Sequence, residues 1–111
     1  MSSFPIGSLV MARRWVRGHQ ERPRKAIVTG TLAGDVVVWF YTLGDPEIGE
    51  SVQAFPAGAL TALEERLEDR SARALLSLER AASRGRLPEG FQSTVHGALV
   101  RRRRIDRAAE G

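Results

Sequence analysis

The sequence predicts an α+β fold in which one small, strongly bent sheet is followed by two or three helices. Residues 35–41 (DVVVWFY) contain an unbroken run of β-branched and aromatic residues, which favours a strand buried on both faces and paired on both edges. The chain before this run has the pattern of strands, whereas leucines after Leu60 recur at helical spacing. We therefore expect the helices to cover what the sheet leaves open.

The first predicted strands lie on either side of a charged segment. Residues 8–13 (SLVMAR) alternate in apolar character and predict a strand with one strongly apolar face. Residues 13–24 are dense in charge, contain Gly, Pro and a lone Trp15, and predict a long loop. Residues 25–30 (KAIVTG) predict a second short strand, and the Gly34-Asp35 turn leads into the central strand.

The remaining elements follow from turn residues and from a change of period. Residues 42–50 are rich in Gly, Pro and Asp and predict a loop, and residues 51–55 predict a strand that Pro56 ends. From Ala59 the leucine spacing predicts helix. The helical elements are expected to be separated at Asp69 or Ser71 and again at Gly85, and the last helix is expected to end in residues 101–104.

Length and composition indicate one domain spanning residues 1–111. The chain has no cysteine, which excludes disulfides, thiolate metal sites and cysteine nucleophiles. Its first residues show no signal-peptide pattern, and no segment is long and apolar enough for a membrane span. We expect further domains attached to this one, because a small binding domain alone would do little.

Two basic clusters flank a nearly neutral middle. Residues 13–25 hold six basic residues against one acid, and residues 84–107 hold seven against two. Such clusters favour a polyanion partner, with nucleic acid first and an acidic membrane surface second. Because sixteen of the seventeen cations are arginine, a compositional bias that scatters arginine over solvated surfaces is the alternative.

The sequence favours a non-catalytic protein without metal or cofactor. Its histidines, His19 and His96, are far apart and have no Asp, Glu or Cys at ligand spacing. Ser93 and Thr94 lie near His96 on one predicted helix, but no third group is placed to orient a nucleophile and base. No glycine-rich phosphate loop is present either, since Gly30 and Gly34 border a turn.

Several local patterns occur in the order found in one family of chromatin readers. They are the Phe-Pro-x-Gly lead at residues 4–7, GSLVMAR at 7–13, VVWFYTLGD at 37–45, FPAGALTAL at 55–63 and GFQSTVHGAL at 90–99. Together they resemble the PWWP domain, a relative of Tudor domains. The resemblance implies a small SH3/Tudor-like curved β-barrel at residues 4–58 followed by a helical bundle at residues 59–108.

The chain departs from this family at the motif that names it. The motif falls on residues 22–25 (RPRK), so neither tryptophan is present, and the loop carrying it is longer than usual. In the family, three aromatic rings form a cage for a methylated lysine, because ring faces attract a quaternary ammonium. Arg24 stands where the second tryptophan is expected, and an arginine would repel that ligand.

The resemblance implies an atypical cage with Trp15, His19 and Phe40 as candidates. On the central strand, Phe40 lies on one face while Trp39 and Tyr41 share the other. If Trp39 and Tyr41 point into the core, Phe40 is left at the cage mouth, and a one-residue slip reverses this. The alternative, in which all three aromatic residues pack in the core, stays open.

The resemblance also implies DNA binding, and hence a chromatin-binding function. The candidate DNA-binding residues are Arg13, Arg14, Arg17, Arg22, Arg24 and Lys25, with a second patch at Arg101, Arg102, Arg103 and Arg104. The expected partners are DNA or a nucleosome, a methylated histone tail and other chromatin proteins, in a nucleus or in the cytoplasm of a prokaryote. The alternatives are an SH3/Tudor-like protein-interaction module and a small bacterial barrel that binds nucleic acid.

Overall fold

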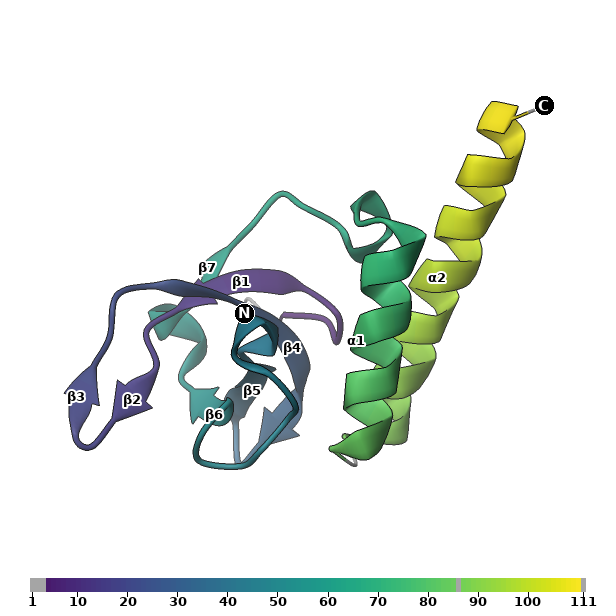
Figure 1. The fold of residues 1–111 in the computed structure, drawn as a ribbon. Helices are drawn as coiled ribbons and strands as arrows, with labels where there is room; N and C mark the ends of the chain where they lie inside the picture. The colour runs from purple at the N-terminus through teal and green to yellow at the C-terminus, as the bar shows by residue number, and fades with distance from the viewer. Residues whose placement is uncertain (1–3, 86, 111) are drawn as a thin grey trace.

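The computed structural model describes residues 4–85 and 87–110, which form an α+β fold (Figure 1). The strands of the main sheet are β1 (Leu9–Ala12), β4 (Arg24–Leu32), β5 (Asp35–Trp39), β6 (Val52–Phe55) and β7 (Thr61–Ala62). A separate hairpin pairs β2 (Trp15–Val16) with β3 (His19–Gln20). The long helices are α1 (Ala72–Arg84) and α2 (Glu89–Glu110). Over the described ranges, no helix is long and apolar enough to cross a membrane.

The main sheet is antiparallel, with the strand order β6-β5-β4-β1-β7. Strands β6 and β7 are its two edges, and the sheet is not closed into a barrel. Single turns of 3₁₀ helix connect the later elements: η1 (Tyr41–Leu43) follows β5, η2 (Ala57–Ala59) precedes β7, and η3 (Leu67–Asp69) precedes α1. The described residues thus hold seven strands and two long helices.

The predicted central strand is confirmed over residues 35–39 as β5, which pairs with β4 on one edge and β6 on the other, whereas Tyr41 begins η1. Its side chains alternate between two apolar clusters, as a period of two requires. Val38 and Phe40 belong to a cluster that contains no residue of the long helices, which we name the inner cluster, and there Phe40 meets Phe55 edge-on with ring centroids 6.1 Å apart. Trp39 belongs to the cluster under the helices. Both faces of the strand are therefore covered.

The helices lie on one face of the sheet and pack against each other, and α2 also contacts β4 (Figure 1). Leu75 of α1 and Phe91 of α2 are fully buried in the cluster that contains Trp39. Trp39 and Phe91 meet edge-on at 6.1 Å, an arrangement that aromatic pairs prefer. The predicted cap is confirmed, because Ser71 accepts a hydrogen bond from the backbone N–H of Ala74 at the start of α1.

The predicted helical bundle at residues 59–108 begins too early. Instead of helix, Thr61 and Ala62 form β7, which pairs with Met11 and Val10 of β1. The leucine spacing misleads here because Leu60 packs in the inner cluster while Leu67 packs under the helices. Those leucines therefore pack in two separate clusters and do not form the apolar face of one helix. The first long helix starts only at Ala72.

The end of α1 is fixed by a close contact with a sheet loop. Gly85 ends the helix, as predicted, and a Cβ atom there would lie 2.6 Å from Cγ of Pro46. Pro46 is buried in the loop between β5 and β6. A glycine is therefore required for the α1–α2 turn to sit this close to the sheet.

Candidate nucleic-acid interface

The connection from β1 to β4, residues 13–23, projects from the sheet as the β2–β3 hairpin, and we name it the arm (Figure 1). Its turn has positive φ at Arg17 (50°) and Gly18 (81°), the pattern of a type I′ hairpin turn. The base of the arm is tied to β6, because the side-chain amide of Gln53 accepts from Trp15 N and donates to Trp15 O, both at 2.8 Å. The predicted loop is thus a supported hairpin with Arg17 at its tip.

The acid of the arm, Glu21, engages two of the predicted DNA-binding residues. Arg14 Nη2 lies 3.3 Å and Arg24 Nε 3.0 Å from the Glu21 carboxylate. Hydrogen bonds, from Arg14 first and Arg24 second, hold the pKa of Glu21 below its ordinary value. Arg14 also donates to the backbone oxygen of Glu50 at 3.0 Å. Both arginines therefore help to hold the arm in shape.

Three predicted residues of the arm keep their charge uncompensated. Arg13, Arg17 and Arg22 are exposed, and no carboxylate of residues 4–85 and 87–110 lies within 4 Å of their side-chain nitrogens. Arg13 donates only to the backbone oxygen of Glu21, at 2.9 Å. The predicted DNA-binding residues of this region thus fall into two groups: cations paired with a carboxylate, and cations without such a partner among the described residues. Lys25 belongs to the paired group, because its Nζ lies 2.9 Å from Glu65.

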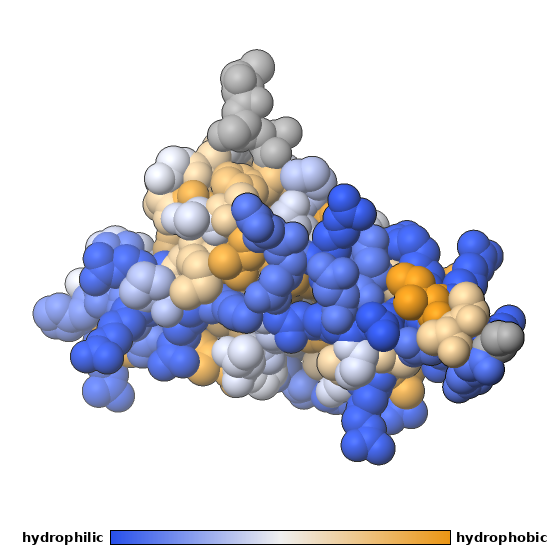
Figure 2. Space-filling view, turned by 90° about the horizontal axis from the view of Figure 1, so that it is seen from above, coloured by the Kyte–Doolittle hydropathy of each residue, from blue (hydrophilic) through white to orange (hydrophobic). Residues whose placement is uncertain are grey.

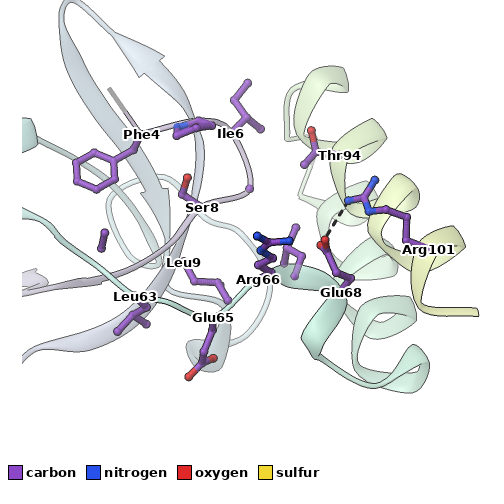
Figure 3. A pocket seen from close by; sticks show the side chains of 14 residues that line it. Phe4, Ile6, Ser8, Leu9, Leu63, Glu65, Arg66, Glu68, Thr94 and Arg101 are labelled. Carbon is purple, nitrogen blue, oxygen red and sulfur yellow. Dashed lines mark ion pairs between the residues drawn. The ribbon is translucent and has the colours of Figure 1, made fainter. Parts of the chain in front are cut away.

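The four consecutive arginines of α2 are divided in the same way. Arg101 reaches from α2 toward Glu68, with the two charged groups 3.5 Å apart beside a pocket near residues 4–9 (Figure 3). Arg102 pairs with Asp106 at 2.9 Å. Arg103 and Arg104 are exposed. Only the last two therefore resemble the free arginines of the arm.

The three cage candidates do not converge. Phe40 has 0% of its surface exposed, so it cannot line an open cage, and the expectation that it does is wrong. Val16 pairs with His19 in the hairpin, which places His19 on the opposite face from Trp15. Strand alternation explains the outcome, because Phe40 follows the inner face of β5 while Trp39 faces the helices.

Trp15 instead borders an apolar groove of about 960 Å³ next to the arm. Gly30, Val37 and Ala54 are cross-strand neighbours at the end of the sheet and form part of its lining. Its rim includes exposed apolar side chains: Trp15 at 49%, Leu32 at 64% and Ile48 at 91%. Sequence reasoning missed Leu32 and Ile48, although an apolar residue beside a Gly-rich turn was the available signal.

Within the part of the chain that the structure describes, no group of three or more His, Cys, Asp or Glu residues could hold a metal ion. His96 is exposed on α2, and its Nδ1 lies 2.7 Å from Oε2 of Glu79 on α1. Such a pair links two helix surfaces.

A family model described as "Family of unknown function (DUF6409)" matches residues 1–110, nearly the whole chain. No curated protein and no solved structure matches the chain.

Proposed function

We propose that this chain, which belongs to the DUF6409 family, is a non-catalytic module that binds DNA through its arm. The observation that carries the proposal is the basic charge of residues 13–25, which hold six basic residues and one acid. Among them, Arg13, Arg17 and Arg22 are exposed and have no carboxylate partner among the described residues. Guanidinium groups in such a setting contact phosphates, which positions a protein on DNA without reading its sequence. Duplex DNA, free or in a nucleosome, is the proposed partner.

The same proposal includes an SH3-like barrel of the Tudor class. Its support is the strand order, which brings β7 next to β1 directly after the single turn η2, and the inner cluster that the bent sheet encloses. The PWWP resemblance enters the proposal through this barrel and through the basic arm. Methyl-lysine recognition is left out of it, because Trp15, His19 and Phe40 do not converge.

The proposal makes a quantitative prediction for salt dependence. If three arm arginines contact phosphates, the slope of log K against log salt is about −2.7, so raising salt from about 50 to about 200 mM lowers affinity by about 40-fold. Fluorescence anisotropy of a labelled duplex of about 20 base pairs measures this slope. Two duplexes of unrelated sequence should give the same value. An affinity that salt leaves unchanged, or no binding at the lower salt, would overturn the proposal.

The apolar groove favours a second candidate, a protein-interaction module. Trp15, Leu32 and Ile48 form a rim of exposed apolar side chains, and exposed patches of this kind mark interaction sites. The proposed ligand is an extended peptide that places apolar side chains in the groove. Short random peptides displayed on phage and selected on the parent protein should lose binding to Ile48→Glu, whose side chain is too exposed to matter for folding. Peptides that bind both proteins equally would remove the groove from consideration.

A further inference from the structure

Helix α2 continues well past the part that packs. It has 22 residues against 13 in α1, and its last buried residue is Leu99. At 1.5 Å per residue, α2 is about 33 Å long. Figure 1 shows its C-terminal part projecting beyond α1. Residues 100–110 therefore form a helical extension that contributes little to the core.

Part of this extension is a cationic surface. Successive residues of an α-helix are about 100° apart, so Arg103, Arg104 and Arg107 fall within an arc of about 100°. The centre of this arc lies about 170° around the helix from Phe91, which is buried against the rest of the protein, whereas Arg103 lies one turn beyond the buried Leu99 on the same side. All three arginines are exposed, and no carboxylate of the described residues lies within 4 Å of their nitrogens. We name these three residues the terminal surface.

Asp106 and Glu110 are the acids nearest to the terminal surface in sequence, and they do not cancel it. Asp106 is paired with Arg102, so Glu110 is the one of these two acids that remains to offset the charge of the three arginines. The C-terminus of a helix is the negative end of its macrodipole, so the backbone does not attract phosphate there. Any phosphate contact must come from the arginine side chains, and we expect the terminal surface to bind more weakly than the arm.

The arm and the terminal surface lie at opposite ends of the molecule. Figure 1 shows the β2–β3 hairpin and the C-terminal end of α2 far apart, and the longest dimension of the protein is 51 Å. Seen from above, hydrophilic side chains cover the hairpin end and extend along the helices (Figure 2). A duplex of about 12 base pairs is about 41 Å long, shorter than the longest dimension of the protein.

We propose that one chain bridges two DNA segments, one held by the arm and the other by the terminal surface. The inference rests on the proposed DNA-binding function and extends it from one surface to two. Its physical basis is the separation of two sets of free arginines by the sheet and the packed helices. A bridging module would hold two duplexes, or two distant parts of one DNA molecule, side by side.

Bridging is tested with duplexes too short to span the protein. Duplexes of about 12 base pairs, half labelled with a donor and half with an acceptor dye, are mixed in excess over the chain at low salt. We expect energy transfer between the dyes, and analytical ultracentrifugation should give complexes of one chain with two duplexes. Arg103→Glu/Arg104→Glu and Arg17→Glu/Arg22→Glu should each abolish the transfer while keeping one duplex bound.

A matched control is Arg73→Glu/Arg80→Glu, which makes the same change of charge at exposed positions of α1. This variant should keep the energy transfer of the parent. If the parent binds one duplex per chain, bridging is overturned and the proposed function stands. Complexes that contain two chains and two duplexes would have the same meaning. If no duplex binds at all, the proposed function itself fails and bridging fails with it.

Discussion

Replacing Phe40 with alanine is expected to lower the free energy of unfolding by about 3–5 kcal/mol. The side chain is fully buried in the inner cluster, where it packs edge-on against Phe55. Alanine would lose the transfer energy of the ring and leave a cavity, because the strands around it are held by pairing on both edges of β5. Urea denaturation followed by circular dichroism measures the change.

Trp15→Ala provides the matched control for Phe40→Ala. Both changes remove an aromatic ring that the cage hypothesis would place at a binding site. Trp15 is 49% exposed, and its hydrogen bonds to Gln53 use backbone atoms that alanine retains. We therefore expect a much smaller loss of stability. If the two variants unfold at the same urea concentration, Phe40 is not a core residue and the two-cluster description of β5 is wrong.

The central part of the fold is predictable because its signals are local. The apolar run of β5 is long enough to require burial on both faces, and Ser71 and Gly85 mark the ends of α1. The stretch from Ala59 to Leu67 is different, because its leucines contact two cores built from distant segments. A one-dimensional pattern cannot distinguish that arrangement from one face of a helix.

The candidate site is predictable in composition but not in geometry. The excess of arginine in residues 13–25 is visible in the sequence, whereas the partners that compensate some of these cations are not. Lys25, for example, pairs with Glu65, which is forty residues away. The orientation of Trp15 and His19 is set by the turn at Arg17 and Gly18, whose positive φ angles the sequence did not reveal.

The second large effect is expected from reversing the charge of the free arm arginines. Arg17→Glu/Arg22→Glu should lower DNA affinity at low salt by more than about tenfold and reduce the salt slope by about 2, because two phosphate contacts become repulsions. Arg14 and Arg24 are unsuitable for this test. They pair with Glu21, so reversing them would disturb the arm itself.

The most direct test of DNA binding by the arm is an anisotropy titration of one labelled duplex with three proteins at about 50 mM salt. These are the parent, Arg17→Glu/Arg22→Glu and the control Arg73→Glu/Arg80→Glu, each shown to be folded by circular dichroism. If the arm contacts the phosphates, the control binds within about twofold of the parent while the arm variant loses more than about tenfold. Equal affinity of the parent and the arm variant would contradict DNA binding by the arm.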